Sequence, residues 1–282
     1  MAGGKGREIK SRMRGITGTH KITKAMGLVA SSKLGKAKER VAASRPYFNT
    51  LYETLSDITS LNREFSSPYV LQSDVRSSCF VVIGGDRGLA GGYNSNLFKM
   101  AGEQAQGKNI QVLPIGKKCL EYYERRELPI FSRQYAVAAD LSVGRCFEIS
   151  RRLCDAFLQR EFDEIVLVYT NFVSILEQVP AAVPVLPLQY DRDKMQPTRK
   201  SILYEPNSEA VFDAIVPEYV AGLIYGALCE AQASELGARH TAMDAASTNA
   251  EEMLDTLSLQ YNRARQGAIT QEITEIVAGA GE

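Results

Sequence analysis

Hydrophobic and small residues in the first part of the chain repeat at alternating steps of four and three residues, a period that predicts one long helix. The repeat comprises Ile9, Met13, Ile16, His20, Thr23, Gly27, Ala30, Leu34, Ala37, Val41, Ser44, Phe48, Leu51, Leu55 and Ile58. At about 1.5 Å per residue such a helix is roughly 75 Å long, which is typical of a coiled coil. Pro46 is expected to kink it. Small and polar residues between His20 and Ala30 favour close approach of another helix over a leucine zipper.

The same four-and-three repeat returns near the C-terminus, after a predicted helix start at residues 206–208. It comprises Phe212, Ile215, Tyr219, Gly222, Gly226, Cys229, Ala233, Leu236, His240, Met243, Ser247, Ala250, Leu254, Leu257, Tyr261, Ala264 and Ala268. Eight heptads correspond to about 85 Å of helix. Two long helices with small-residue seams, at opposite ends of one chain, predict an antiparallel intramolecular coiled coil, in which Gly27, Gly222 and Gly226 would let the backbones approach closely.

The middle of the chain has a different pattern, in which short β-branched runs alternate with helical stretches, as in βαβ units. The pattern predicts strands at 79–84, 110–115, 164–170, 173–179 and 183–188, and a weaker one at 129–135. It predicts helices at 94–106, 117–126 and 141–160. The fold class is therefore α/β: an open, mostly parallel sheet with helices on both faces, joined to a long antiparallel coiled coil.

Composition agrees with a folded protein, and charge is distributed unevenly. Of 282 residues, 45% are hydrophobic, and 33 basic residues balance 33 acidic ones. Residues 1–45 nevertheless hold twelve basic side chains against two acidic ones, a net charge of +10. The neutral total argues against a nucleic-acid-binding protein, whereas the basic segment indicates a partner of its own. Nucleic acid, an anionic membrane and an acidic protein surface all remain possible partners for it.

Candidate chemistry is sparse. The glycine-rich stretch 84–92 follows a strand, as a dinucleotide loop would, but it contains neither GxGxxG nor a P-loop lysine, so a structural turn is expected. The two histidines, His20 and His240, fall on the coiled-coil seams and are expected to pack there. Five separated cysteines without a CxxC pair favour structural thiols in a reducing compartment and no metal site. We therefore expect no catalytic residues, no cofactor and no metal.

Targeting signals are also absent from the pattern. No run approaches the roughly 20 apolar residues that span a bilayer, and the start of the chain lacks the apolar centre of a secretory signal. The basic N-terminus is compatible with an organelle transit peptide, but the helical repeat continues through it. A soluble protein is expected.

Three motifs resemble those of the gamma subunit of the F-type ATP synthase. Residues 21–37 read KITKAMGLVASSKLGKA, followed by ASRPY at 43–47. Residues 86–94 read DRGLAGGYN, and residues 261–280 read YNRARQGAITQEITEIVAGA. LYEP at 203–206 fits as well, so the resemblance covers the whole chain at consistent spacing.

This resemblance implies a non-catalytic rotor. Its N- and C-terminal helices (1–60 and 207–282) would form the central shaft, and residues 75–190 a Rossmann-like α/β domain beside its foot. The implied partners are the alpha and beta subunits of the catalytic head, the epsilon subunit and the c-subunit ring, with no nucleic acid. Proton flow through the ring would turn the shaft, which changes the nucleotide affinity of each catalytic site. The implied location is the cytoplasmic face of a bacterial inner membrane, with a mitochondrial one as the alternative.

The resemblance also assigns contact residues. Lys24, Met26, Arg265, Gln266, Thr270 and Glu272 lie in the blocks that face the beta subunit, whereas Tyr204 and Glu205 lie in the foot that meets the c ring. Ile269, Ile273, Ile276 and Val277 suit a shaft tip in an apolar sleeve.

Two departures and two rival functions remain. Ala90 stands where many members have cysteine, so no redox role attaches to that position, and residues 189–201 lack the cysteine pair of the chloroplast-type insert. A basic coiled-coil scaffold that binds nucleic acid is one rival function. A nucleotide-dependent enzyme built on residues 75–190 is the other.

Overall fold

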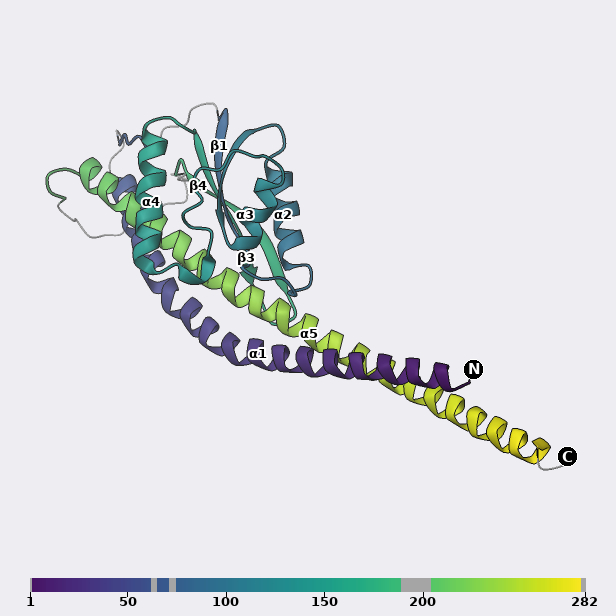
Figure 1. Ribbon diagram of the computed structural model, residues 1–282. Coiled ribbons are helices and arrows are strands. Elements are labelled where there is room, and N and C mark those ends of the chain that lie inside the picture. Colours follow the sequence, from purple (N-terminus) through teal and green to yellow (C-terminus); the bar gives the residue numbers. More distant parts are fainter. Residues whose placement is uncertain (1, 62–64, 71–74, 189–203, 280–282) are drawn as a thin grey trace. The chain divides into compact units, whose positions relative to one another are not determined.

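The computed structural model describes residues 2–61, 65–70, 75–188 and 204–279. The chain divides into two compact units. We call residues 1–31 with 239–282 the helix-pair unit, and residues 32–238 the sheet unit. Two helices contribute to both: α1 (Ala2–Leu61) and α5 (Ser208–Gly279). Figure 1 traces α1 in purple and α5 from green to yellow.

The helix-pair unit is an antiparallel pair formed by the first half of α1 and the second half of α5. His20 faces Glu251, Thr23 faces Ser247 and Gly27 faces Met243, so numbers rise along one helix as they fall along the other. The Thr23 and Ser247 hydroxyls are buried and 2.8 Å apart. A methyl group on Gly27 would lie 3.5 Å from Met243 Cβ, which is ordinary contact, so the two helices approach closely here.

The sheet unit contains one four-stranded sheet in the order β2-β1-β3-β4. Its strands are β1 (Ser77–Ile83), β2 (Asn109–Ile115), β3 (Glu164–Phe172) and β4 (Gln178–Leu186). β1 pairs in parallel with both β2 and β3, and β3 pairs antiparallel with β4. The remaining helices are α2 (Tyr93–Gln104), α3 (Lys117–Glu124), the short 3-10 turn Ala138–Asp140 and α4 (Val143–Leu158).

Helices cover both faces of this sheet (Figure 1). Alternate β1 residues point to opposite sides because side chains alternate along a strand. Phe80 and Val82 pack with α2 and α3, for example against Leu97. Cys79, Val81 and Ile83 pack on the other side, in the larger core that includes α4 and the first half of α5. A third small cluster, which includes Leu34 and Ala233, joins α1 to α5 within the sheet unit.

The helical repeats of the sequence are confirmed. Every seam position of α1 and α5 whose side chain the structure describes is buried or half-buried; the side chain of Phe48 lies outside the described part. The predicted start of the C-terminal helix is confirmed at Ser208. α1 continues through Pro46 as one helix. The α/β class and the mostly parallel sheet are also confirmed.

Three strand predictions are wrong in detail. Residues 129–135 form no strand but only an isolated bridge between Ile130 and Val112, because the segment contributes a single pair of hydrogen bonds to the sheet edge. The two strands expected at 173–179 and 183–188 are one strand, β4, preceded by a turn in which the Ser174 hydroxyl accepts from the Leu176 and Glu177 N–H groups. The three-domain division stays a prediction, and its residues 1, 189, 190 and 280–282 lie outside the described part.

One property of α5 was missed. Although the sequence has no long uninterrupted apolar run, α5 contains a window long and apolar enough to cross a membrane. Half of that window is buried inside the fold. Burial of this kind is also the property of a core helix, and α5 is one, since residues such as Phe212 and Val216 belong to the main core.

Candidate functional site

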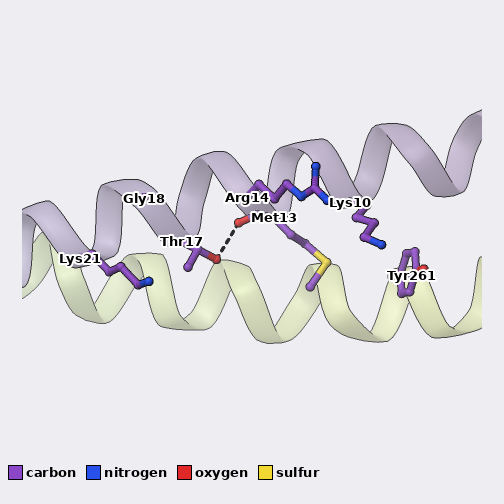
Figure 2. Close-up of a pocket in the computed structure, with 7 residues that line it drawn as sticks. All are labelled: Lys10, Met13, Arg14, Thr17, Gly18, Lys21 and Tyr261. Carbon is purple, nitrogen blue, oxygen red and sulfur yellow. Dashed lines mark hydrogen bonds between the residues drawn. The ribbon is translucent and has the colours of Figure 1, made fainter.

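The helix-pair unit carries an open groove of about 540 Å³ on the basic segment of α1. It is lined by Lys10, Met13, Arg14, Thr17, Gly18, Lys21 and Tyr261. Figure 2 shows Met13 extending from α1 toward α5, and Tyr261 projecting from α5 near Lys10. Three cations thus lie along the α1 side of the groove, and Met13 and the Tyr261 ring supply its apolar part. This combination suits an acidic, partly apolar partner, because long basic side chains lay apolar stems along a surface and keep the charge at its edge.

Part of the basic segment gathers at the groove. The basic residues of α1 with described side chains are all exposed. Lys10, Arg14 and Lys21 gather on one side, at steps of four and seven residues that place side chains on the same helix face. That spacing was the signal that could have identified the groove.

A different side of α1 exposes apolar side chains. Ile22 is 62% exposed and Val29 is 55% exposed. Seven residues separate them, so they lie on one face of the helix, away from the seam that contains Thr23 and Gly27. Leu28 is also 67% exposed and lies seven residues after Lys21, on the face of the basic groove. Exposed apolar side chains therefore occur on more than one side of this part of α1.

The end of α5 extends beyond the N-terminus of α1 (Figure 1). The antiparallel pairing leaves the last turns of α5 without a partner helix, and Ile269, Ile273, Ile276 and Val277 are all exposed. The last two are 70% and 68% exposed. Four aliphatic side chains on an unpaired helix end are consistent with a surface that another protein covers.

The residues predicted to face the beta subunit all lie in the helix-pair unit. Lys24, Arg265, Gln266 and Glu272 are exposed. Met26 is half-buried at the edge of the seam. Thr270 is exposed and donates its hydroxyl to the Gln266 carbonyl at 2.9 Å. The four predicted residues from Arg265 to Glu272 lie within about two turns of α5. Lys24 and Met26 lie apart from them, on α1.

The predicted foot residues lie just before α5. Tyr204 is half-buried and packs against the main core, and its hydroxyl is buried without a hydrogen-bond partner among the described residues. Burial raises the pKa of Tyr204, and the nearby charge of Asp57 raises it further. Glu205 is exposed. The Tyr204 ring is therefore anchored against the core of the sheet unit, whereas the Glu205 carboxylate next to it is exposed to solvent.

The glycine-rich loop 84–92 is structural. Asp86 accepts hydrogen bonds from the N–H groups of Lys117, Ala138 and Ala139 at 3.0–3.1 Å, so it already provides the anion at the start of α3. Gly85 faces the carboxylate of Glu235, whose atoms would lie 3.0 Å from a methyl group there. Two carboxylates, those of Asp86 and Glu235, thus lie at this loop and would repel the phosphate of a nucleotide.

The thiols are buried as well. All five cysteines are free, and burial raises the pKa of Cys146 and Cys154 to about 12. The described residues contain no cluster of three or more metal-ligating side chains. His240 packs on the seam with Nδ1 3.2 Å from the Gly27 carbonyl oxygen, and His20 Nε2 lies 3.0 Å from a Glu251 oxygen. Both histidines are thus seam residues, as predicted.

Comparison with known proteins decides the family. A sequence model of the ATP synthase family matches residues 5–281. The ATP synthase gamma chain of Ruminococcus albus is 41% identical over 275 residues, which cover 96% of each chain. That of Xanthomonas oryzae pv. oryzae is 38% identical over 286 residues, which cover 99% of each chain. The chain belongs to the ATP synthase gamma chain family. The resemblance seen in the three sequence motifs is confirmed, and these relatives are bacterial.

Solved structures support the fold. A chain of the Euglena gracilis mitochondrial ATP synthase (OSCP/F1/c-ring, rotational state 3) superposes with a TM-score of 0.70, 19% identity and coverage of 99% of this chain and 94% of that one. A chain of the central stalk and c ring of the Tetrahymena thermophila mitochondrial ATP synthase gives a TM-score of 0.61 at 23% identity, covering 80% of this chain and 99% of that one. Long terminal helices around a small α/β sheet are thus a fold that ATP synthase structures contain.

Proposed function

We propose that this chain is the central rotor of an F-type ATP synthase, which couples proton flow through a membrane c ring to ATP synthesis and hydrolysis at alpha and beta subunits. The observation that carries the proposal is the match of nearly the full chain to gamma chains, together with a helix pair whose surface is chemically uneven. In this proposal the chain contributes no catalytic group. The buried thiols, the seam histidines and the carboxylates at the glycine-rich loop support that part.

The uneven surface supplies a mechanism. The basic groove at Lys10 and Arg14 and the apolar face at Ile22 and Val29 lie on different sides of α1. A rotating shaft of this kind presents a different surface to each surrounding subunit in turn. A site that binds one surface better than the other is shifted toward one of its conformations, and the shift is limited by that difference in affinity.

We assign the beta-subunit contacts to Lys24 and Met26 on α1 and to Arg265, Gln266, Thr270 and Glu272 on α5. Exposure of the polar members supports this assignment, since polar contacts on a wet surface can form and break at each step of rotation. The apolar end of α5 at Ile276 and Val277 would turn inside an apolar sleeve, where no ion pair resists the rotation.

We assign the c-ring contact to Tyr204 and Glu205. The half-buried Tyr204 ring would hold the segment against the main core while Glu205 meets the ring. The epsilon subunit would lie beside this foot. The complex would sit at the cytoplasmic face of a bacterial inner membrane, which the bacterial relatives support.

Reconstitution tests the rotor function. The full chain is mixed with alpha and beta subunits, and ATP hydrolysis is compared with and without the chain; the complex is then joined to c-ring membranes to measure ATP-driven proton pumping. We expect a stable complex that needs the chain for sustained hydrolysis and pumping. Equal hydrolysis without the chain would contradict the proposal, whereas salt-sensitive binding of DNA by the chain alone would favour the scaffold alternative.

Charge reversal tests the beta-subunit contacts. The double variant Arg265→Glu with Gln266→Glu should reduce pumping per ATP hydrolysed while the isolated chain keeps its unfolding midpoint, because both side chains are exposed. Lys99→Glu, an exposed charge reversal on α2, is the matched control and should leave coupling unchanged. An equal loss of pumping per ATP in the double variant and in Lys99→Glu would contradict the assignment of Arg265 and Gln266 to the beta-subunit contact. Unfolding of the double variant would show that the two positions are structural.

A further inference from the structure

Residues 231–237 of α5 pack at the carboxyl ends of the parallel strands β1 and β3. The chain leaves β1 through α2 on one face of the sheet and returns from β2 to β3 through α4 on the other face. In open α/β sheets the crevice at such a reversal is where ligands bind. Here the residues that follow β1 and those at the end of β3 contact α5 instead, at residues 231–237.

Two contacts come from the segment after β1. The Tyr93 hydroxyl donates to the Ala231 carbonyl at 3.1 Å, and this hydrogen bond is buried. Gly85 lies so close to the Glu235 carboxyl group that a methyl group at position 85 would come within 3.0 Å of it. Ala231 itself is 2% exposed. A β-carbon at residue 85 would require the Glu235 side chain to shift, so glycine favours this close approach.

Two further contacts come from β3 and β4. The Ser234 hydroxyl donates to the Thr170 carbonyl at 3.0 Å, and Ser234 is fully buried. On the next turn of α5, a methyl group on Gly237 would lie 3.3 Å from the Gln178 side chain. Gly85, Tyr93, Thr170 and Gln178 thus contact one side of the same two turns of α5, and we call these four residues the collar.

α1 is tied to the same place. Arg45 of α1 pairs with Glu230 of α5 at 3.7 Å, and the Phe172 N–H donates to Glu230. Lys38 of α1 lies 5.2 Å from the centre of the Phe172 ring. Both long helices are therefore linked to the β3–β4 hairpin where α5 makes its last contacts within the sheet unit.

We propose that the collar is the element that passes torque between the α/β domain and the shaft helix α5. The inference rests on the proposed rotor function. The main core already holds the first half of α5. The collar adds buried hydrogen bonds and close contacts of small residues at the point where α5 leaves the sheet unit, and such directional bonds resist twisting of the helix more than non-directional apolar contacts do. In this chain α5 occupies the place where open α/β sheets usually bind a ligand. This occupancy also accounts for the missing dinucleotide motif.

Three variants test the collar in the assembled complex. Gly85→Val crowds the Glu235 carboxylate, so that the loop or the Glu235 side chain must shift. Gly88→Val is its matched control in the same loop, because a methyl group at Gly88 meets no atom within 4 Å. The milder double variant Tyr93→Phe with Ser234→Ala removes two hydroxyl groups that link α5 to the sheet unit and keeps the surrounding packing. The measurements are ATP hydrolysis, ATP-driven proton pumping and amide exchange of residues 228–238.

We expect Gly85→Val and the double variant to speed amide exchange in this segment about tenfold, which corresponds to ~1.4 kcal/mol, and to lower pumping per ATP hydrolysed severalfold. Hydrolysis itself should change little, and the unfolding midpoint of the double variant should fall modestly because two buried carbonyls lose their donors. A purely structural role would lower the midpoint equally but leave the pumping ratio intact. Gly88→Val should behave as the wild type. Should Gly85→Val fail to fold, the double variant decides alone.

An unchanged pumping ratio, despite faster exchange in the double variant, would overturn the collar proposal. That result leaves the rotor function standing, because the wild-type complex would still pump. A wild-type complex that hydrolyses ATP without pumping would instead contradict the rotor function itself, so the two failures are distinguishable.

Discussion

The two units of this chain use the same helices in different ways. In the sheet unit α1 and α5 belong to a deep core, where side chains such as Leu55, Ile58 and Phe212 are fully buried. In the helix-pair unit they touch along a seam of small and polar residues such as Thr23, Gly27 and Ser247, while apolar side chains remain exposed. Both units expose some large apolar side chains, for example Leu176 at 83% in the sheet unit, but among the described residues only the sheet unit also contains a deep apolar core. We infer that the sheet unit is stabilised from within, and that the helix-pair unit relies on the proteins around it.

The largest expected difference is in thiol reactivity. All five cysteines belong to the sheet unit, and burial raises the pKa of Cys146 and Cys154 to about 12 from an ordinary value near 9. Because the thiolate is the reactive form, alkylation at pH 8 should be slowed about a thousandfold. An exposed cysteine in the helix-pair unit, Ser31→Cys, should react as a free thiol. Mass spectrometry after iodoacetamide treatment measures both, and rapid alkylation of the native sheet-unit cysteines would contradict the burial.

The same shifts predict how stability depends on pH. A thiol whose pKa is raised in the folded state stays protonated there while the unfolded chain loses its proton. Its contribution is therefore fully present below pH 9 and is lost as the pH rises toward 12. Urea midpoints measured from pH 8 upward should fall for the sheet unit, and a flat profile would be inconsistent with these shifts.

Matched leucine truncations should separate the units next. Leu97 is fully buried in the sheet unit, whereas Leu254 is half-buried on the seam of the helix-pair unit. Leu97→Ala should cost about 2–5 kcal/mol of unfolding free energy because it leaves a cavity. Leu254→Ala should cost about 1 kcal/mol or less, since water can refill the site. Urea denaturation measures both, and equal costs would mean that the seam is as tightly packed as the core.

Gly27 should distinguish close approach from mere helix contact. In Gly27→Leu the added side chain would push against Met243 and His240 and should destabilise the helix pair by about 1–3 kcal/mol. Gly27→Ala meets Met243 Cβ at 3.5 Å, an ordinary contact, and should stabilise the helix by about 0.5–1 kcal/mol. Thermal unfolding followed by circular dichroism tests both signs. If Gly27→Leu were neutral, the helices would not be in close contact at this point.

The smallest effect is expected at the buried hydroxyl pair. Each of the two hydroxyls also lies within reach of a carbonyl of its own helix, at 3.1 Å for Thr23 and 2.9 Å for Ser247. A hydroxyl has one proton, so the one that donates across the seam gives up its own carbonyl, and after one hydroxyl is removed the other can still donate to that carbonyl. Thr23→Val and Ser247→Ala should each cost about 0.5–1.5 kcal/mol, and the double variant less than their sum. A double-mutant cycle in urea measures this coupling, and strict additivity would show that the 2.8 Å contact contributes nothing.

The sequence predicted the long helices well, because a sustained repeat over fifty residues fixes which side of a helix is buried. Positions as unlike as His20, Gly27 and Leu34 all lie on the seam of α1 as expected. The edges of the sheet were harder to predict. Residues 173–179 are β-branched enough to resemble a strand, but the turn at Ser174 and the register of β4 with β3 depend on long-range pairing that periodicity does not record.

The functional surface was predicted only in part. The family motifs led to Lys24 and Arg265, which are exposed on the helix pair. The groove at Lys10 and Arg14 and the collar at Gly85 and Tyr93 were missed, because each combines residues from distant segments. Tyr261 joins the groove from more than two hundred residues away, and Ala231 meets Tyr93 only after folding.

The most direct test of the rotor function is to watch the chain turn. Since the five native thiols are buried, the exposed position of Lys99→Cys can carry a single bead or fluorophore. The labelled chain is assembled with alpha and beta subunits fixed to a surface, and the label is followed by single-molecule microscopy as ATP is added. We expect stepwise rotation in one direction that stops when ATP is withdrawn. A complex that hydrolyses ATP while the label stays still would contradict the account.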